Sequence, residues 1–102
     1  MLGILFDNAV EALKGSSEKV ISFEVYELSD GYEFTVKNPF RYASYDEISQ
    51  WFQLEKSEKG VGRGLGLYHL KRLCEEWKCD IVCRNEEIEQ SNWIVFTLKM
   101  GI

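Results

Sequence analysis

Residues 60–67 read Gly-Val-Gly-Arg-Gly-Leu-Gly-Leu, with glycine at every second position. An amphipathic helix is predicted to open from this stretch, because apolar side chains recur at spacings of three and four: Leu67, Leu70, Leu73, Cys74 and Trp77. Bare backbone N–H groups at the positive end of a helix form an anion site, most naturally for phosphate. The plainer alternative is a hinge that caps the helix. The P-loop motif is absent, and leucines occupy the positions where a dinucleotide fingerprint needs its last glycine.

The segments around this stretch alternate helices with hairpins. Apolar residues at helical spacing predict the first helix, period-two alternation predicts the strands, and Asp30-Gly31 is a strong hairpin turn. Asn38-Pro39 is expected to end the second strand, because proline cannot donate to a ladder. The predicted elements are a helix (2–13), two strands (21–26 and 32–37), a short helix (45–52), the helix of the glycine stretch, and two strands (about 79–84 and 92–99) around an acidic loop (85–90). This order predicts an α+β fold with helices on one face of a mostly antiparallel sheet.

Length, charge and cysteine pattern exclude several classes of function for this chain. The chain has 102 residues, 45% of them hydrophobic, which suits a single domain over residues 1–102. Its 17 acidic and 12 basic residues give a net charge of −5, which argues against nucleic acid and anionic membranes as partners. No apolar run approaches a membrane span, and the three cysteines form no C-x-x-C pair, so we expect buried thiols in a reducing cytoplasm and no zinc site. A helix that is formed at residue 2 indicates that the domain was cut from a longer chain.

Two asparagines are candidate ligand residues. Asn8 lies beside Asp7 on the first helix, and a neutral amide oxygen suits a magnesium ion that is held mostly by water and phosphate. Asn38 stands at a strand end before proline. The alternatives are a helix face that meets solvent for Asn8 and an ordinary turn residue for Asn38.

Together these features resemble the ATP-binding domain of the GHKL superfamily, which includes gyrase, MutL and the histidine kinases. Leu2-Gly-Ile-Leu-Phe-Asp-Asn-Ala-Val-Glu-Ala12 is similar to its N box, and residues 60–67 to its second glycine box. The resemblance spans nearly the whole chain and is nearest to the AgrC-like sensor histidine kinases. It implies a Bergerat-type α/β sandwich with a mixed, mostly antiparallel sheet, truncated at its N-terminus, and a lid over about residues 40–61.

The resemblance also implies roles for single residues. Asn8 would coordinate the magnesium that bridges the ATP phosphates, and Asn38 would accept a hydrogen bond from the adenine amino group. Gly62, Gly64 and Gly66 would let the backbone approach the phosphates, while Leu65 and Leu67 anchor the helix. Arg63 or Lys59 is a candidate for positive charge near the phosphates. No residue of this chain is assigned as catalytic, and we interpret His69 as structural, not as a phosphoacceptor.

Three departures from the family pattern bear on activity. Asn38-Pro39 replaces an Asp-x-Gly box, which removes a charge from adenine recognition and predicts weak ATP binding. Glu11 stands where many histidine kinases have a lysine. Ile4 stands where hydrolytic relatives carry a glutamate, so no general base is available to activate water. This favours phosphoryl transfer over hydrolysis, since transfer depends mainly on positioning and charge neutralisation.

The function that we predict is therefore the ATP-binding catalytic domain of a two-component sensor histidine kinase. It would bind Mg-ATP and phosphorylate a histidine in an adjacent dimerisation domain, and the parent, a bacterial membrane receptor, would act on a response regulator. Two alternatives stay open: a stand-alone anti-sigma-type serine kinase, and a degenerate domain that serves as a protein-interaction module. If strands are missing at the N-terminus, an exposed sheet edge would allow pairing with a second copy. Tyr45, Trp51 and Phe52 are expected either to fill the core or to form a docking patch.

Overall fold

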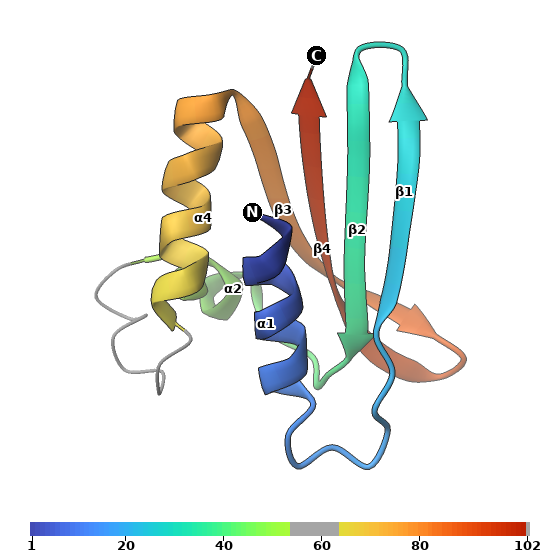
Figure 1. Ribbon diagram of the computed structural model, residues 1–102. Helices are drawn as coiled ribbons and strands as arrows, with labels where there is room; N and C mark the ends of the chain where they lie inside the picture. The colour runs from blue at the N-terminus through green and yellow to red at the C-terminus, as the bar shows by residue number, and fades with distance from the viewer. Residues whose placement is uncertain (54–63, 102) are drawn as a thin grey trace.

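The computed structural model describes residues 1–53 and 64–101, which form helices and strands in the predicted order (Figure 1). The elements are α1 (Leu2–Ala12), β1 (Ser22–Leu28), β2 (Gly31–Pro39), α2 (Tyr45–Trp51), α4 (Gly64–Trp77), β3 (Cys79–Ile88) and β4 (Ser91–Gly101).

The four strands form one sheet in the order β1-β2-β4-β3, and every pairing is antiparallel. Two hairpins, β1-β2 and β3-β4, meet through the long central pairing of β2 with β4, which runs from Gly31↔Gly101 to Pro39↔Trp93. The predicted α+β class and the antiparallel character of the sheet are confirmed.

The prediction of an acidic loop over residues 85–90 is wrong. Strand β3 continues through Ile88, so only Glu89 and Gln90 form the turn. Both turn residues have positive φ, 49° and 68°, which is the conformation that matches a two-residue hairpin to the twist of its strands. The sequence predicted a longer loop because the segment is acidic and contains no glycine, and positive φ values are uncommon for residues other than glycine.

Strand β2 ends at Asn38-Pro39 as expected, and the pairing shows why proline is tolerated there. The Phe40 N–H donates to the Asn92 carbonyl oxygen at 2.9 Å, so Phe40 turns its N–H toward β4. Alternate residues of an antiparallel strand point their N–H groups to opposite neighbours. Pro39 is therefore placed toward the β1 side, where pairing has already stopped at Ser22↔Lys37. No ladder hydrogen bond is lost.

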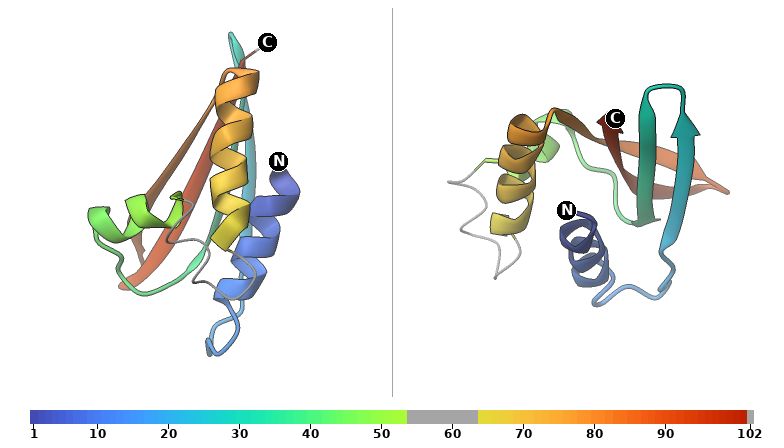
Figure 2. Two further views of the ribbon diagram at one scale, coloured as in Figure 1. Left: turned by 90° about the vertical axis from the view of Figure 1, so that its left-hand side faces the viewer. Right: turned by 45° about the horizontal axis from the view of Figure 1, so that its top comes forward.

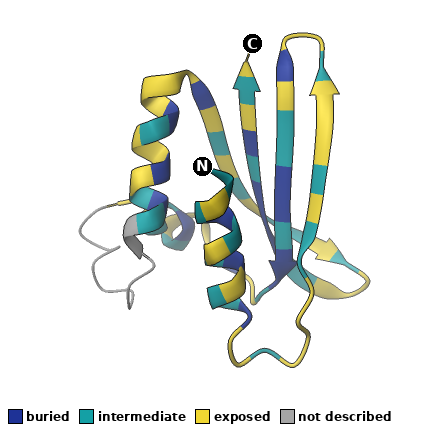
Figure 3. Cartoon of the chain, in the orientation of Figure 1, coloured by how far each residue is buried: buried dark blue, intermediate teal, exposed yellow. Residues whose placement is uncertain are grey.

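Helices α1 and α4 lie side by side on one face of the sheet, and the core forms between the two layers (Figures 1 and 2). Figure 3 shows the buried side of each helix turned toward the central strands. The largest fully buried side chains include Phe96, Leu5, Leu70, Leu98 and Val36. Trp77 does not join this core as predicted: it is 69% exposed, because α4 ends there and Lys78, at φ 57°, turns the chain into β3.

The cysteines are free thiols, and their burial makes stability depend on pH. Burial raises the pKa of Cys83 to about 12 and is the largest cause raising that of Cys74 to about 11, from an ordinary 9.0. Above about pH 9 the unfolded chain releases protons that the native thiols keep, so the free energy of unfolding should fall as pH rises and stay level below that pH. Urea unfolding at stepped pH measures this. In Cys83→Ala the free energy of unfolding should fall less steeply with pH. The same slope in the variant and the wild-type protein would contradict this prediction.

Candidate functional site

Helices α1 and α4 pack against each other at Gly66. A Cβ built on Gly66 would lie 3.2 Å from Cγ2 of Ile4, so a side chain there would press on α1. Figures 1 and 2 show that the two helices run in opposite directions. Glycine at this position thus sets the spacing of the two helices.

Asn8 lies one helical turn beyond this crossing on α1. Asn8 follows Ile4 by four residues, about 6 Å along α1, while Gly64 precedes Gly66 by about 3 Å in the same direction. Because the helices run in opposite directions, Asn8 lies on the side of the crossing that faces the N-terminal end of α4. Asn8 is half-buried. Its neighbour Ala9 is buried in the core, which sets the rotation of α1 about its axis and so the face on which the Asn8 amide lies.

The N-terminal end of α4 carries a partial positive charge because of the helix dipole. A helix of 14 residues presents unpaired N–H groups and a partial positive charge at its first turn, and α4 has no acidic residue there to offset it. Glu11, one of the departures from the family pattern, forms an ion pair with Lys14 at 3.2 Å. The Glu11 carboxylate is thereby partly neutralised, which lowers its repulsion of an anion.

Asn38 lies at the end of β2, on the face that carries the helices, and is 1% exposed. Its Nδ2 donates to the Pro39 carbonyl oxygen at 2.9 Å. A carbonyl oxygen can only accept, so this contact settles which end of the amide is nitrogen. The other end, Oδ1, is an acceptor held in a fixed direction.

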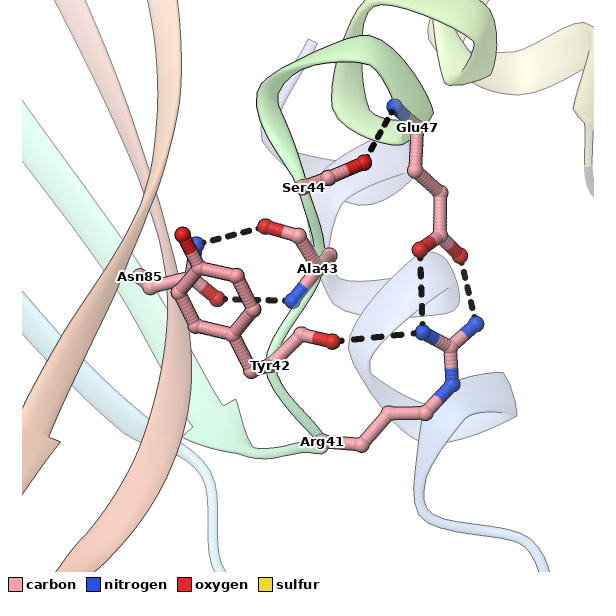
Figure 4. Close-up of polar contacts among 6 residues, drawn as sticks. All are labelled: Arg41, Tyr42, Ala43, Ser44, Glu47 and Asn85. Carbon is pink, nitrogen blue, oxygen red and sulfur yellow. Dashed lines mark hydrogen bonds and ion pairs between the residues drawn. The ribbon is translucent and has the colours of Figure 1, made fainter.

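The chain beyond Asn38 is held to the sheet by two further asparagines, one of them drawn in Figure 4. The Asn85 side chain accepts from the Ala43 N–H at 3.0 Å and donates to the Ala43 carbonyl oxygen at 2.7 Å. Asn92 Nδ2 donates to Asn85 Oδ1 at 3.0 Å and to the Phe40 carbonyl oxygen at 3.1 Å. The sequence prediction missed both residues, because it placed Asn85 in a surface loop and gave Asn92 no role beyond the strand.

The short helix α2 is also fixed in place. Ser44 caps it by accepting from the Glu47 N–H at 3.1 Å, and Glu47 pairs with Arg41, whose hydrogen bond holds the pKa of the Glu47 carboxyl below its usual range (Figure 4). Phe52 stacks edge-on against Phe96 at 6.3 Å. Trp51 and Phe52 pack against the core, so core filling is confirmed for them, while Tyr45 is 83% exposed.

The predicted site residues fall into three groups. The α1–α4 crossing brings Gly66 against Ile4, one turn before Asn8 on the same helix, and α1 also contacts β2, the strand that carries Asn38. Gly64 and Leu65 head α4. Gly62, Arg63 and Lys59 lie outside the described residues, as do residues 54–61 of the predicted lid. His69 is exposed on α4, with its ring edge-on to Tyr68 at 5.7 Å.

A family model described as GHKL domain matches residues 1–102. The chain belongs to the GHKL family. No curated protein matches the chain. GHKL domains bind ATP, generally with Mg²⁺, and the family includes ATPases and kinases. In the part of the chain that the structure describes, no helix is long and apolar enough to cross a membrane.

Proposed function

We propose that this GHKL domain is the ATP-binding catalytic domain of an AgrC-like two-component sensor histidine kinase. The observation that supports the proposal is the packing of α1 against the acid-free first turn of α4 at the Gly66–Ile4 crossing, with Asn8 one turn beyond Ile4 on α1. A neutral amide oxygen next to an electropositive helix start combines a magnesium ligand with a phosphate cradle.

The residues present fit Mg-ATP. Asn8 would supply an oxygen to the magnesium ion, and the backbone N–H groups at the start of α4 would face the phosphates. Asn38 would offer Oδ1 to the adenine amino group, since its Nδ2 is committed to Pro39. Gly62, Arg63, Gly64 and Leu65 remain predicted contacts to the phosphates. Bound magnesium would neutralise charge on the triphosphate.

The site favours phosphoryl transfer over hydrolysis. Ile4 packs against Gly66 at the position where hydrolytic relatives have a glutamate, so this position holds no carboxylate to activate water. What this chain supplies is positioning and electrostatic stabilisation, which are the main requirements of phosphoryl transfer. The partners that we propose are the dimerisation domain of the same protein, which carries the phosphoacceptor histidine, and a response regulator. The proposed location is the cytoplasmic side of a membrane receptor.

Phosphotransfer in the presence of the dimerisation domain tests this function. The domain, joined to its preceding helical segment, is incubated with magnesium and radiolabelled ATP. We expect label that is lost in acid and stable in alkali, as phosphohistidine is, and that disappears when the acceptor histidine is replaced by alanine. Acid-stable label on a serine of a partner protein would instead support the serine-kinase alternative. Nucleotide binding without any transfer would contradict the kinase proposal.

The interaction-module alternative makes a different prediction. Asn38-Pro39 and Glu11, the two departures that support it, are both accommodated in the structure: Asn38 presents an acceptor and Glu11 has a cation at 3.2 Å. A domain that has lost ATP binding would show no magnesium-dependent affinity for nucleotide.

A further inference from the structure

The peptide unit between Pro39 and Phe40 is held from both sides. Its carbonyl oxygen accepts from Asn38 Nδ2 at 2.9 Å, and its N–H donates to the Asn92 carbonyl oxygen at 2.9 Å. The orientation of the Asn38 amide therefore depends on a peptide plane that β4 holds.

The Asn92 side chain adds a second hydrogen bond to Phe40. Its Nδ2 donates to the Phe40 carbonyl oxygen at 3.1 Å, so the backbone N–H and C=O of Phe40 both bind one residue. The Asn92 amide also donates to Asn85 Oδ1 at 3.0 Å, and Asn85 in turn grips Ala43. These contacts are part-buried and connect strands β3 and β4 to the segment that follows Asn38.

We propose that Asn92 is a positioning residue for adenine recognition. It acts through the Pro39–Phe40 peptide, which keeps Asn38 Nδ2 engaged and leaves Oδ1 as the group that meets the base. This inference rests on the proposed function, since it assumes that Asn38 contacts adenine.

The physical consequence is selectivity for the 6-amino group. A site that presents only an acceptor rejects a base that lacks the donor, because the buried acceptor is then left unpaired. Without the Asn92 side chain, Phe40 keeps only its main-chain bond to residue 92, so the Pro39–Phe40 peptide is held less firmly and the Asn38 amide gains freedom to rotate. Either end of the amide then faces the base, and the preference for the amino group is lost.

The test compares ATP with purine riboside 5′-triphosphate, which lacks the 6-amino group, by calorimetric titration in magnesium. We expect the wild-type protein to prefer ATP by about tenfold, the size of one hydrogen bond of about 1.4 kcal/mol. In Asn92→Ala the preference should fall to about twofold or less. In Asn38→Ala it should already be lost, and adding Asn92→Ala should change it no further.

Two controls separate positioning from loss of structure. Ile48→Val removes one methyl group from the α2 core contact, lowers stability modestly and should leave the ATP preference intact. A purely structural role of Asn92 would weaken both nucleotides equally, and an unchanged ratio in Asn92→Ala would overturn the inference while the proposed function stands. Failure of the wild-type protein to bind either nucleotide would overturn both.

Discussion

Replacing Asn8 by alanine should weaken magnesium-dependent nucleotide binding at least about tenfold, the largest effect that we expect from any single substitution outside the core. The reason is geometric. Asn8 is a half-buried polar residue on α1, one turn beyond the Ile4–Gly66 contact in the direction of the N-terminal end of α4. Alanine keeps the helix and removes the oxygen that would bind magnesium.

Asp7→Ala is the matched control for this prediction. Asp7 neighbours Asn8 on the same helix but is exposed, so its removal should leave nucleotide affinity within about twofold. Thermal unfolding of both variants confirms that α1 is intact. Equal losses of affinity in Asp7→Ala and Asn8→Ala would point to a general charge or folding effect and would contradict a specific role for Asn8.

Gly31→Ala should lower the free energy of unfolding by at least about 3 kcal/mol. Gly31 opens β2 at φ 155°, and an added Cβ would lie 1.9 Å from the Met100 carbonyl oxygen. That oxygen belongs to β4, whose pairing with β2 forms the centre of the sheet, so neither strand can move away cheaply. For a domain of this size the melting temperature should drop by about 12–24 °C.

Gly101→Ala tests whether the clash, and not the loss of glycine itself, causes this effect. Gly101 is the register partner of Gly31, yet a Cβ there would meet only the Asp30 carbonyl oxygen at 3.7 Å, an ordinary contact. Urea unfolding should show a change of less than about 1 kcal/mol for Gly101→Ala. A Gly31→Ala protein as stable as Gly101→Ala would contradict the predicted clash.

The sequence predicted the elements whose pattern is local. The apolar spacing of Leu5 and Ala9 and the Asp30-Gly31 turn identified α1 and the β1-β2 hairpin, because each depends on neighbouring residues. The β3-β4 turn was missed, since Glu89 and Gln90 adopt positive φ without the glycine that normally marks such a turn.

The sequence motifs predicted individual residues of the candidate site but not the tertiary contacts that arrange them. Asn8 and the glycine stretch were identified by their resemblance to a family, and the packing of their two helices depends on the Gly66–Ile4 crossing, a tertiary feature that spacing does not encode. The support of Asn38 by Asn92 joins residues 54 positions apart, and Asn85 reaches Ala43 across 42 positions. Such pairs follow from strand register, which is set only when the whole sheet forms.

The most direct test of the account is calorimetric titration of the protein with a non-hydrolysable ATP analogue, with magnesium and with magnesium removed by a chelator. We predict binding with a dissociation constant between micromolar and millimolar that requires magnesium. Absence of binding at millimolar nucleotide in the presence of magnesium would contradict the proposed site between α1 and α4.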